Sequence, residues 1–204
     1  MGCLGTSAGN VKEKVTKALA GEKSRVVMFI GGPNSQRDEM AKKIAEEFNY
    51  AYIDCGNLVN NVISTKSALW EDLQNDLQSG GLVNSSRLIS LIKLKMPSDN
   101  KKVLLNGFPK SKENIDTWNK EMVEKADIKG YVYLEVDDAK MNEVAVGEYA
   151  LNVQAKITTF KNETLPVIES LRNNENFLTF DGAKNADELF NEIKQKFVEK
   201  KLYQ

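Results

Sequence analysis

Short apolar runs alternate with amphipathic stretches along most of the chain. Residues 26–30 form an apolar run that stops at Gly31-Gly32-Pro33, which is typical of a buried strand ending in a tight loop. From Asp38 to residue 48, apolar residues recur every three or four positions, as in a helix that packs one face on a core. The same two patterns predict further strands over 50–53, 103–105, 130–136 and 177–180, and further helices over 67–79, 85–96, 111–123, 151–171 and 186–202.

This alternation predicts the class of fold. Parallel strands need long crossover connections, usually helices, and those helices cover both faces of the sheet. We therefore expect one α/β three-layer domain over residues 25–204, with a five-stranded parallel sheet and helices on both faces. Residues 1–24 form an extension in front of it, in which a short helix is predicted over 11–20.

Composition excludes several kinds of function. The chain has 204 residues with 28 Lys and Arg against 29 Asp and Glu, so no overall charge favours nucleic acid. It has no histidine and two cysteines, which excludes histidine-based catalysis and a zinc site, and we expect no metal site. No apolar run approaches the roughly 20 residues of a membrane span, and no secretory signal is visible. An intracellular protein is expected.

The loop after the first predicted strand is the most informative segment. In a phosphate-binding loop G-x-x-x-x-G-K-[ST], backbone N–H groups and a helix N-terminus hold the phosphates, and the lysine neutralises them. Residues 31–39 read Gly-Gly-Pro-Asn-Ser-Gln-Arg-Asp-Glu, so Gln36 replaces the second glycine and Arg37 the lysine. On this segment alone, Arg37 is as well explained as a surface residue of the first helical turn as it is as a phosphate ligand.

The order of the motifs along the chain resembles the short nucleoside monophosphate kinases, the adenylate and UMP/CMP kinases. Their loop G-G-P-G-S-G-K-G-T is echoed at 31–35, their S-T-G-[DE]-L-L-R at 54–60, and their G-x-L-V-P at 80–84. Their D-G-[FY]-P-R is echoed at 106–110 and their T-E-P-V-I at 164–168. The resemblance implies a phosphate-loop fold with strand 26–30 in the centre of the sheet. It also implies a helical segment for the monophosphate over 55–96, and transfer of the ATP γ-phosphate with Mg²⁺.

The resemblance also assigns candidate residues. The degenerate equivalents of the catalytic cations are Arg37, Lys110 and Lys156. The nucleotide-binding candidates are Gly31, Gly32, Pro33, Asn34, Ser35, Gln36, Arg37, Asp38, Cys55, Gly56, Asn60, Val83, Gly107 and Asn114.

The charged parts of the family pattern are the ones that have changed. Asp38 and Glu39 replace Gly and Thr; they can cap their own helix at a gain of about 0.3–1 kcal/mol each, and they repel a polyphosphate. Asn60 stands where the family has the arginine that holds the monophosphate, and Asn106 where it has the aspartate that helps to hold magnesium. The shortened lid, residues 141–150, holds no Arg or Lys, although phosphoryl transfer depends on such charges.

We therefore expect a pseudokinase that acts as a membrane-tethered binding or scaffold protein. A slow nucleoside monophosphate kinase that uses ATP and Mg²⁺ is the alternative, and a nucleotide sensor that binds without transfer is a third possibility. Gly2 and Thr6 fit the pattern M-G-x-x-x-[ST] for myristoylation, and Cys3 adjoins it as a candidate for palmitoylation. A cytoplasmic, membrane-associated monomer is expected, with weak nucleotide binding and a protein partner that the sequence does not identify.

Overall fold

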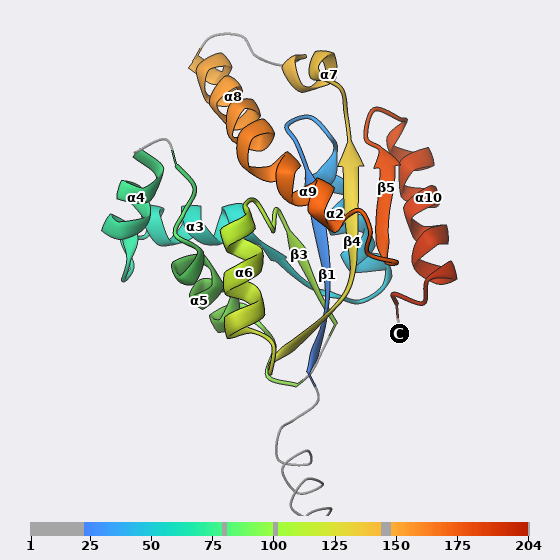
Figure 1. The fold of residues 1–204 in the computed structure, drawn as a ribbon, viewed down its shortest axis with the longest axis horizontal. Helices are drawn as coiled ribbons and strands as arrows, with labels where there is room; N and C mark the ends of the chain where they lie inside the picture. The colour runs from blue at the N-terminus through green and yellow to red at the C-terminus, as the bar shows by residue number, and fades with distance from the viewer. Residues whose placement is uncertain (1–22, 79–80, 100–101, 144–147, 204) are drawn as a thin grey trace, which may run out of the picture.

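The fold is a parallel sheet between two layers of helices (Figure 1). It comes from a computed structural model that describes residues 23–78, 81–99, 102–143 and 148–203. The five strands lie side by side in the order β2-β3-β1-β4-β5, and every neighbouring pair is parallel. The strands are β1 (Ser24–Gly31), β2 (Ala51–Asp54), β3 (Lys102–Asn106), β4 (Ala126–Glu135) and β5 (Phe177–Asp181). The predicted class of fold and the central place of the first strand are both confirmed.

The helices connect these strands and pack on both faces of the sheet. They are α2 (Arg37–Glu47), α3 (Cys55–Ser64), α4 (Trp70–Gln78), α5 (Ser85–Lys95), α6 (Lys112–Glu121), α7 (Asp138–Asn142), α8 (Glu148–Thr159), a π-helical turn η1 (Phe160–Thr164), α9 (Leu165–Leu171) and α10 (Ala186–Glu199).

The alternation of side chains along β1 divides the core into two clusters. Val27 and Phe29 point to one face, where α2 and α10 cover them. Val26, Met28 and Ile30 point to the other face, which the helices between β2 and β4 and the segment η1–α9 cover. A strand that is buried on both faces reads as a continuous apolar run, which is why residues 26–30 are apolar throughout.

The bounds of several predicted elements differ from the structure. The helix expected over 67–79 begins at Trp70, because Lys66 and Leu69 have φ angles of 48° and 75°, which a helix cannot contain. The strand expected over 130–136 begins four residues earlier, at Ala126, where it pairs with the start of β1. The helix expected over 186–202 ends at Glu199, and Lys201 has a positive φ of 54°.

The single helix expected over 151–171 contains a π-helical turn. Pro166 lies in the first turn of α9, directly after η1. Proline has no N–H to donate, and its ring collides with the carbonyl group four residues earlier in an α-helix. The wider turn at Phe160–Thr164 accommodates that ring, and it brings Phe160 and Thr164 to buried positions beside the loops described below.

Candidate functional site

The loops that follow the strands meet at one edge of the sheet, which we name the carboxyl edge. Because all five strands are parallel, the loop after β1, the N-terminus of α3 after β2 and the loop after β3 lie together there (Figure 1). Ligands of open α/β sheets bind at this edge, where the strand connections diverge to opposite sides. Here β1 lies between β3 on one side and β4 on the other, so the connections diverge at β1.

The loop after β1 has the backbone of a glycine loop although three glycines of the family pattern are replaced, two of them within the loop and one, at Asp38, in the first turn of α2. Asn34 and Gln36 stand where the family pattern has glycine, and both have positive φ angles, 59° and 60°. Position 31 requires glycine for a steric reason, because an added Cβ would lie 2.4 Å from Ser35 Oγ. That hydroxyl donates to the carbonyl oxygen of Gly32 at 2.8 Å and closes the turn.

Side chains of the loop hold this backbone in place. The Asn34 amide donates to the carbonyl oxygens of Lys140 at 3.3 Å and Met141 at 3.0 Å, in α7. The Gln36 amide donates to those of Gly182 and Lys184, each at 2.8 Å, in the turn between β5 and α10. The loop is therefore fixed on both sides by the two residues that replaced its glycines.

Arg37 is engaged by the protein itself. Its guanidinium group donates to Asp38 Oδ1 from Nη2 at 2.6 Å and from Nε at 3.0 Å. Nη1 donates to the carbonyl oxygen of Gly31 at 2.9 Å. The group also lies beside Gly107, whose φ is +74°, at 3.7–3.9 Å from the position that a Cβ would take there. The structure thus brings Arg37 to the site, with an aspartate as its partner.

An amide bridges two acidic residues next to this pair. Nδ2 of the buried Asn106 donates to Asp38 Oδ1 and to Asp54 Oδ2, each at 2.7 Å, and Tyr52 Oη lies 3.1 Å from the same nitrogen. An aspartate at 106 would face both acids with a third negative charge, so the neutral amide is what allows Asp38 and Asp54 to approach. Asn106 Oδ1 is the one buried side-chain polar atom without a hydrogen-bond partner within the described residues.

The pKa of Asp38 reflects this network. Burial raises the pKa of the carboxyl group, but Arg37, the Asn106 amide and Lys110 together outweigh it, so the pKa lies below its usual value. Asp38 is therefore a carboxylate at neutral pH.

Lys110 is the second cation of the site. In the described part of the chain its ammonium group forms no salt bridge, and burial followed by repulsion from Arg37 lowers its pKa. Lys156 repels it as well, while Asp54 attracts it. Both other predicted catalytic cations therefore act electrostatically on Lys110, with Lys156 exposed on α8.

Several other nucleotide-binding candidates are engaged in packing or in hydrogen bonds within the protein. Cys55 is buried, and burial raises the pKa of its thiol to about 12, which makes it unreactive. Asn114 is also buried: its Oδ1 accepts from the Lys110 backbone N–H at 2.9 Å and its Nδ2 donates to Ser85 Oγ at 2.8 Å, so its amide is engaged within the protein. Val83 packs against the core. Asn60 is exposed on α3, and Gly56 is partly buried in the first turn of that helix.

The expected helix caps are not formed by the two acids. Asp38 and Glu39 do lie in the first turn of α2, but no side chain caps this helix. Asp38 turns instead to Arg37 and Asn106, and Glu39 pairs with Lys43 at 2.8 Å. An ionic partner one residue away outcompetes the backbone N–H groups for Asp38.

Sequence reasoning missed four residues of this edge. Tyr52 and Asp54 contact Asn106, and the signal for them was their position at the carboxyl end of a predicted strand. Thr164 Oγ1 donates to the carbonyl oxygen of Lys110 at 2.9 Å, and Phe160 lies against Gly32, where an added Cβ would be 3.2 Å from its ring. The π-helical turn that positions this second pair has no sequence signal other than Pro166.

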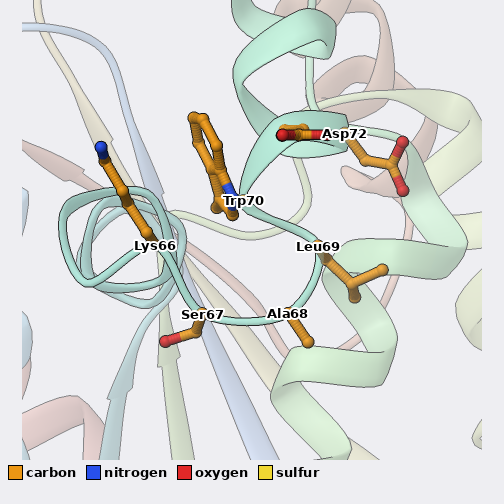
Figure 2. Close-up of a pocket in the computed structure, with 7 residues that line it drawn as sticks. Lys66, Ser67, Ala68, Leu69, Trp70 and Asp72 are labelled. Atoms are coloured by element: carbon orange, nitrogen blue, oxygen red, sulfur yellow. The ribbon is translucent and has the colours of Figure 1, made fainter.

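A separate hollow lies at the connection between α3 and α4 and shares no lining residue with the glycine loop. Its volume is about 390 Å³. Figure 2 shows Trp70 standing beside Lys66, whose ammonium nitrogen is 5.6 Å from the centre of the Trp70 ring, with Leu69 on the other side. Residues 66–72 line the hollow.

Two groups of predictions concern residues beyond those described. The lipidation candidates Gly2 and Cys3 and the short helix predicted over 11–20 lie outside the described residues, and so do residues 144–147 of the expected lid. None of the helices in the described ranges has the length and apolar character needed to cross a membrane.

Comparisons with known proteins agree with the fold and with the motif order. The family model for adenylate kinase matches residues 29–176. The UMP-CMP kinase of Gallus gallus is 26% identical over 192 residues, which cover 84% of this chain and 96% of that protein. The UMP-CMP kinase of Homo sapiens is 24% identical over 195 residues, and the match covers 86% of this chain and 97% of that protein. UMP-CMP kinase 3 of Oryza sativa subsp. japonica is 26% identical over 197 residues, and the match covers 92% of this chain and 93% of that protein. The chain belongs to the adenylate kinase family.

Proposed function

We propose that this member of the family has lost most or all phosphotransfer and acts as a membrane-tethered binding or scaffold protein. One observation carries the proposal: the cation of the phosphate loop is paired with a carboxylate of the same loop. Asp38 Oδ1 accepts two hydrogen bonds from Arg37, and the Asn106 amide donates a third to the same oxygen.

This pairing opposes a polyphosphate in two ways. Three of the five N–H groups of Arg37 already donate to Asp38 and to the Gly31 carbonyl group, so its charge is largely offset within the protein, and the Asp38 carboxylate repels the phosphate. Like charges about 4 Å apart cost roughly 1 kcal/mol in water and roughly 4 kcal/mol near a protein surface. The sequence of the expected lid, which contains no Arg or Lys over 141–150, supplies no replacement charge there.

A slow nucleoside monophosphate kinase is the second candidate. The observation in its favour is that Arg37 and Lys156 both act electrostatically on Lys110 at the carboxyl edge, and that Lys110 forms no salt bridge with the described residues. The relatives named UMP-CMP kinase favour a pyrimidine monophosphate as the acceptor in that case.

A coupled assay with MgATP and AMP, CMP or UMP separates the two candidates. Loss of one partner that stabilises transition-state charge costs a factor of about 100–1,000, so turnover several orders of magnitude below the usual roughly 1–100 s⁻¹ is expected. Turnover inside that range would refute the pseudokinase. Calorimetry run beside the assay detects nucleotide binding without transfer, which would indicate a sensor.

A variant that restores the family loop tests the electrostatic argument directly. Gln36→Gly, Arg37→Lys, Asp38→Gly and Glu39→Thr together should tighten MgATP binding, yet should not restore full turnover while the lid has no basic residues. Gln36→Gly alone is the matched control, since it removes the loop anchor and leaves the Arg37–Asp38 pair in place.

A further inference from the structure

The three most exposed large apolar side chains of the described residues lie at the C-terminal ends of helices, at the edge of the sheet opposite to the candidate site. Within the described residues, Leu94 is 81% exposed, Val123 51% and Val198 50%, whereas Leu69 and Leu77 on α4 are each 42% exposed. Leu94 and Val198 lie in the last turns of α5 and α10, and Val123 lies just after α6. These helices run opposite to the strands that they connect, so their C-terminal ends lie where the strands begin (Figure 1).

Hydrogen bonds and an ion pair join these ends into one surface. Lys93 at the end of α5 pairs with Glu121 at the end of α6 at 2.5 Å. The backbone N–H of Ser24, which begins β1, donates to the carbonyl oxygen of Lys125 at 2.9 Å. The ammonium group of Lys102, which begins β3, donates to the carbonyl oxygen of Tyr203 at 2.7 Å. We name this surface the amino-edge face, consisting of residues 23–25, 93–96, 120–125 and 198–203.

The amino-edge face is basic as well as partly apolar. It contains eight Lys or Arg against three acidic residues. Of those three, Glu121 pairs with Lys93 and Glu199 with Lys196, and the neighbouring Asp127 pairs with Lys23 and Lys129. Lysines at helix C-termini are favoured by the helix dipole. The dipole does not explain why Leu94 and Val123 stand exposed among them.

The N-terminal segment joins the domain at this same face. Residues 1–22 connect to Lys23, and Ser24 begins β1. That segment carries the proposed lipid anchor at Gly2 and the basic residues Lys12, Lys14 and Lys17. A surface of basic residues with interspersed apolar side chains is the kind that lies at the interface of an anionic bilayer.

We propose that the amino-edge face lies against anionic lipid headgroups, with Leu94 and Val123 at the interface. The candidate site, at the opposite edge of the sheet, then faces away from the membrane. This inference rests on the proposed membrane tether. Each basic residue held near an anionic leaflet contributes about a fivefold gain in binding.

Hydrogen–deuterium exchange of the full chain on vesicles tests the orientation. The chain is coupled through Cys3 to a maleimide lipid in phosphatidylcholine vesicles with or without phosphatidylserine; Cys55, the other cysteine, is buried with its thiol pKa raised to about 12. With phosphatidylserine, amide exchange in residues 93–96 and 120–125 should slow at least severalfold, and exchange in α4 should not change. Slowing in α4 instead, or at neither place, would overturn the inference.

Substitutions at the face provide the second test. Leu94→Glu with Val123→Glu should abolish most of the slowing, whereas Leu77→Glu, an exposed leucine of α4, should leave it intact. Equal slowing in all three proteins would also overturn the inference. Because the coupling is chemical, absence of acylation in cells would defeat the proposed tether without changing this result, so the two failures are distinguishable.

Discussion

At the scale of single residues, the site is defined by the charge of Asp38. Asp38→Asn keeps the shape of the side chain and an oxygen for Arg37 but removes the negative charge. Because a like charge about 4 Å from a phosphate costs roughly 1–4 kcal/mol, MgATP should bind about tenfold more tightly to this variant. Calorimetry measures the change, and Asp116→Asn, which removes an exposed carboxylate that pairs with Lys112, is the control. Equal affinity in the wild type and Asp38→Asn would contradict the electrostatic account.

The lowered pKa of Asp38 also predicts how stability depends on pH. A carboxyl group whose pKa is lower in the folded than in the unfolded protein stabilises the fold at any pH above the pKa of the unfolded state, here 3.8. This stabilisation is lost as the pH falls from that value through the lower pKa of the folded state. The difference in free energy of unfolding between the wild type and Asp38→Asn should therefore be constant from pH 7 to 5 and shrink below about pH 3.8. Urea titrations at several pH values measure it, and a decline already between pH 7 and 5 would disagree.

Lys110 offers a prediction of opposite sign. Its pKa is lowered by burial and by Arg37, so holding it charged opposes folding at neutral pH. Lys110→Met should raise the melting temperature by about 2–4 °C, which corresponds to roughly 1 kcal/mol in a protein of this size. Lys112→Met, where the lysine is exposed and pairs with Asp116, should leave it unchanged. A lower melting temperature for Lys110→Met would contradict this prediction, because it would mean that attraction to groups such as Asp54 outweighs the cost of burying the Lys110 ammonium group.

These residues also show where sequence reasoning reached its limit. The replacement of the loop lysine by Arg37 and of the motif aspartate by Asn106 was visible in the sequence. Their joint consequence was not, because the contact between Asn106 and Asp38 spans 68 residues and depends on the register of β1 against β3. Likewise, the sequence does not show that Asn34 and Gln36, which stand where the family loop has glycine, both have positive φ angles and bond to distant carbonyl groups.

At the scale of elements, periodicity predicted most strands and helices well because β1, β3 and β4 are largely buried and helices such as α2, α5 and α10 bury one apolar face. It failed where a local conformation decides, as at Leu69 with its positive φ and at the π-helical turn. Periodicity reports which side chains are apolar, and it carries no information on how the backbone accommodates a proline inside a long helix.

The π-helical turn gives the prediction at this scale. Thr164→Val removes the buried hydroxyl that donates to the Lys110 carbonyl group and should cost about 1–2 kcal/mol of unfolding free energy. Thr158→Val removes an equally short bond, 2.9 Å to the Gln154 carbonyl oxygen, but an exposed one within its own helix, and should cost less than about 0.5 kcal/mol. Chemical denaturation of both variants measures these free energies, and equal losses of unfolding free energy would mean that the bond from η1 to Lys110 does not stabilise the site.

At the scale of the whole molecule, the tether is the feature to test in cells. One myristoyl chain gives a partition constant of only about 10⁴ M⁻¹, so stable residence needs a second signal, for which Cys3 or the lysines at 12, 14 and 17 are available. Gly2→Ala should move the protein fully to the cytosol, and Cys3→Ser should leave it partly on membranes. Fractionation measures both, and mass spectrometry that finds a free or acetylated N-terminus on the native protein would end the proposal.

The bonds of Asn34 and Gln36 have a consequence for how the protein persists in a cell. A protein that draws stability from a bound ligand has a folded population that follows the concentration of that ligand. In this loop the side chains of Asn34 and Gln36 donate hydrogen bonds to α7 and to the turn after β5, so the protein itself supplies these contacts. With the proposed loss of tight nucleotide binding, the folded population of the protein is expected to stay constant when the cellular concentration of ATP falls.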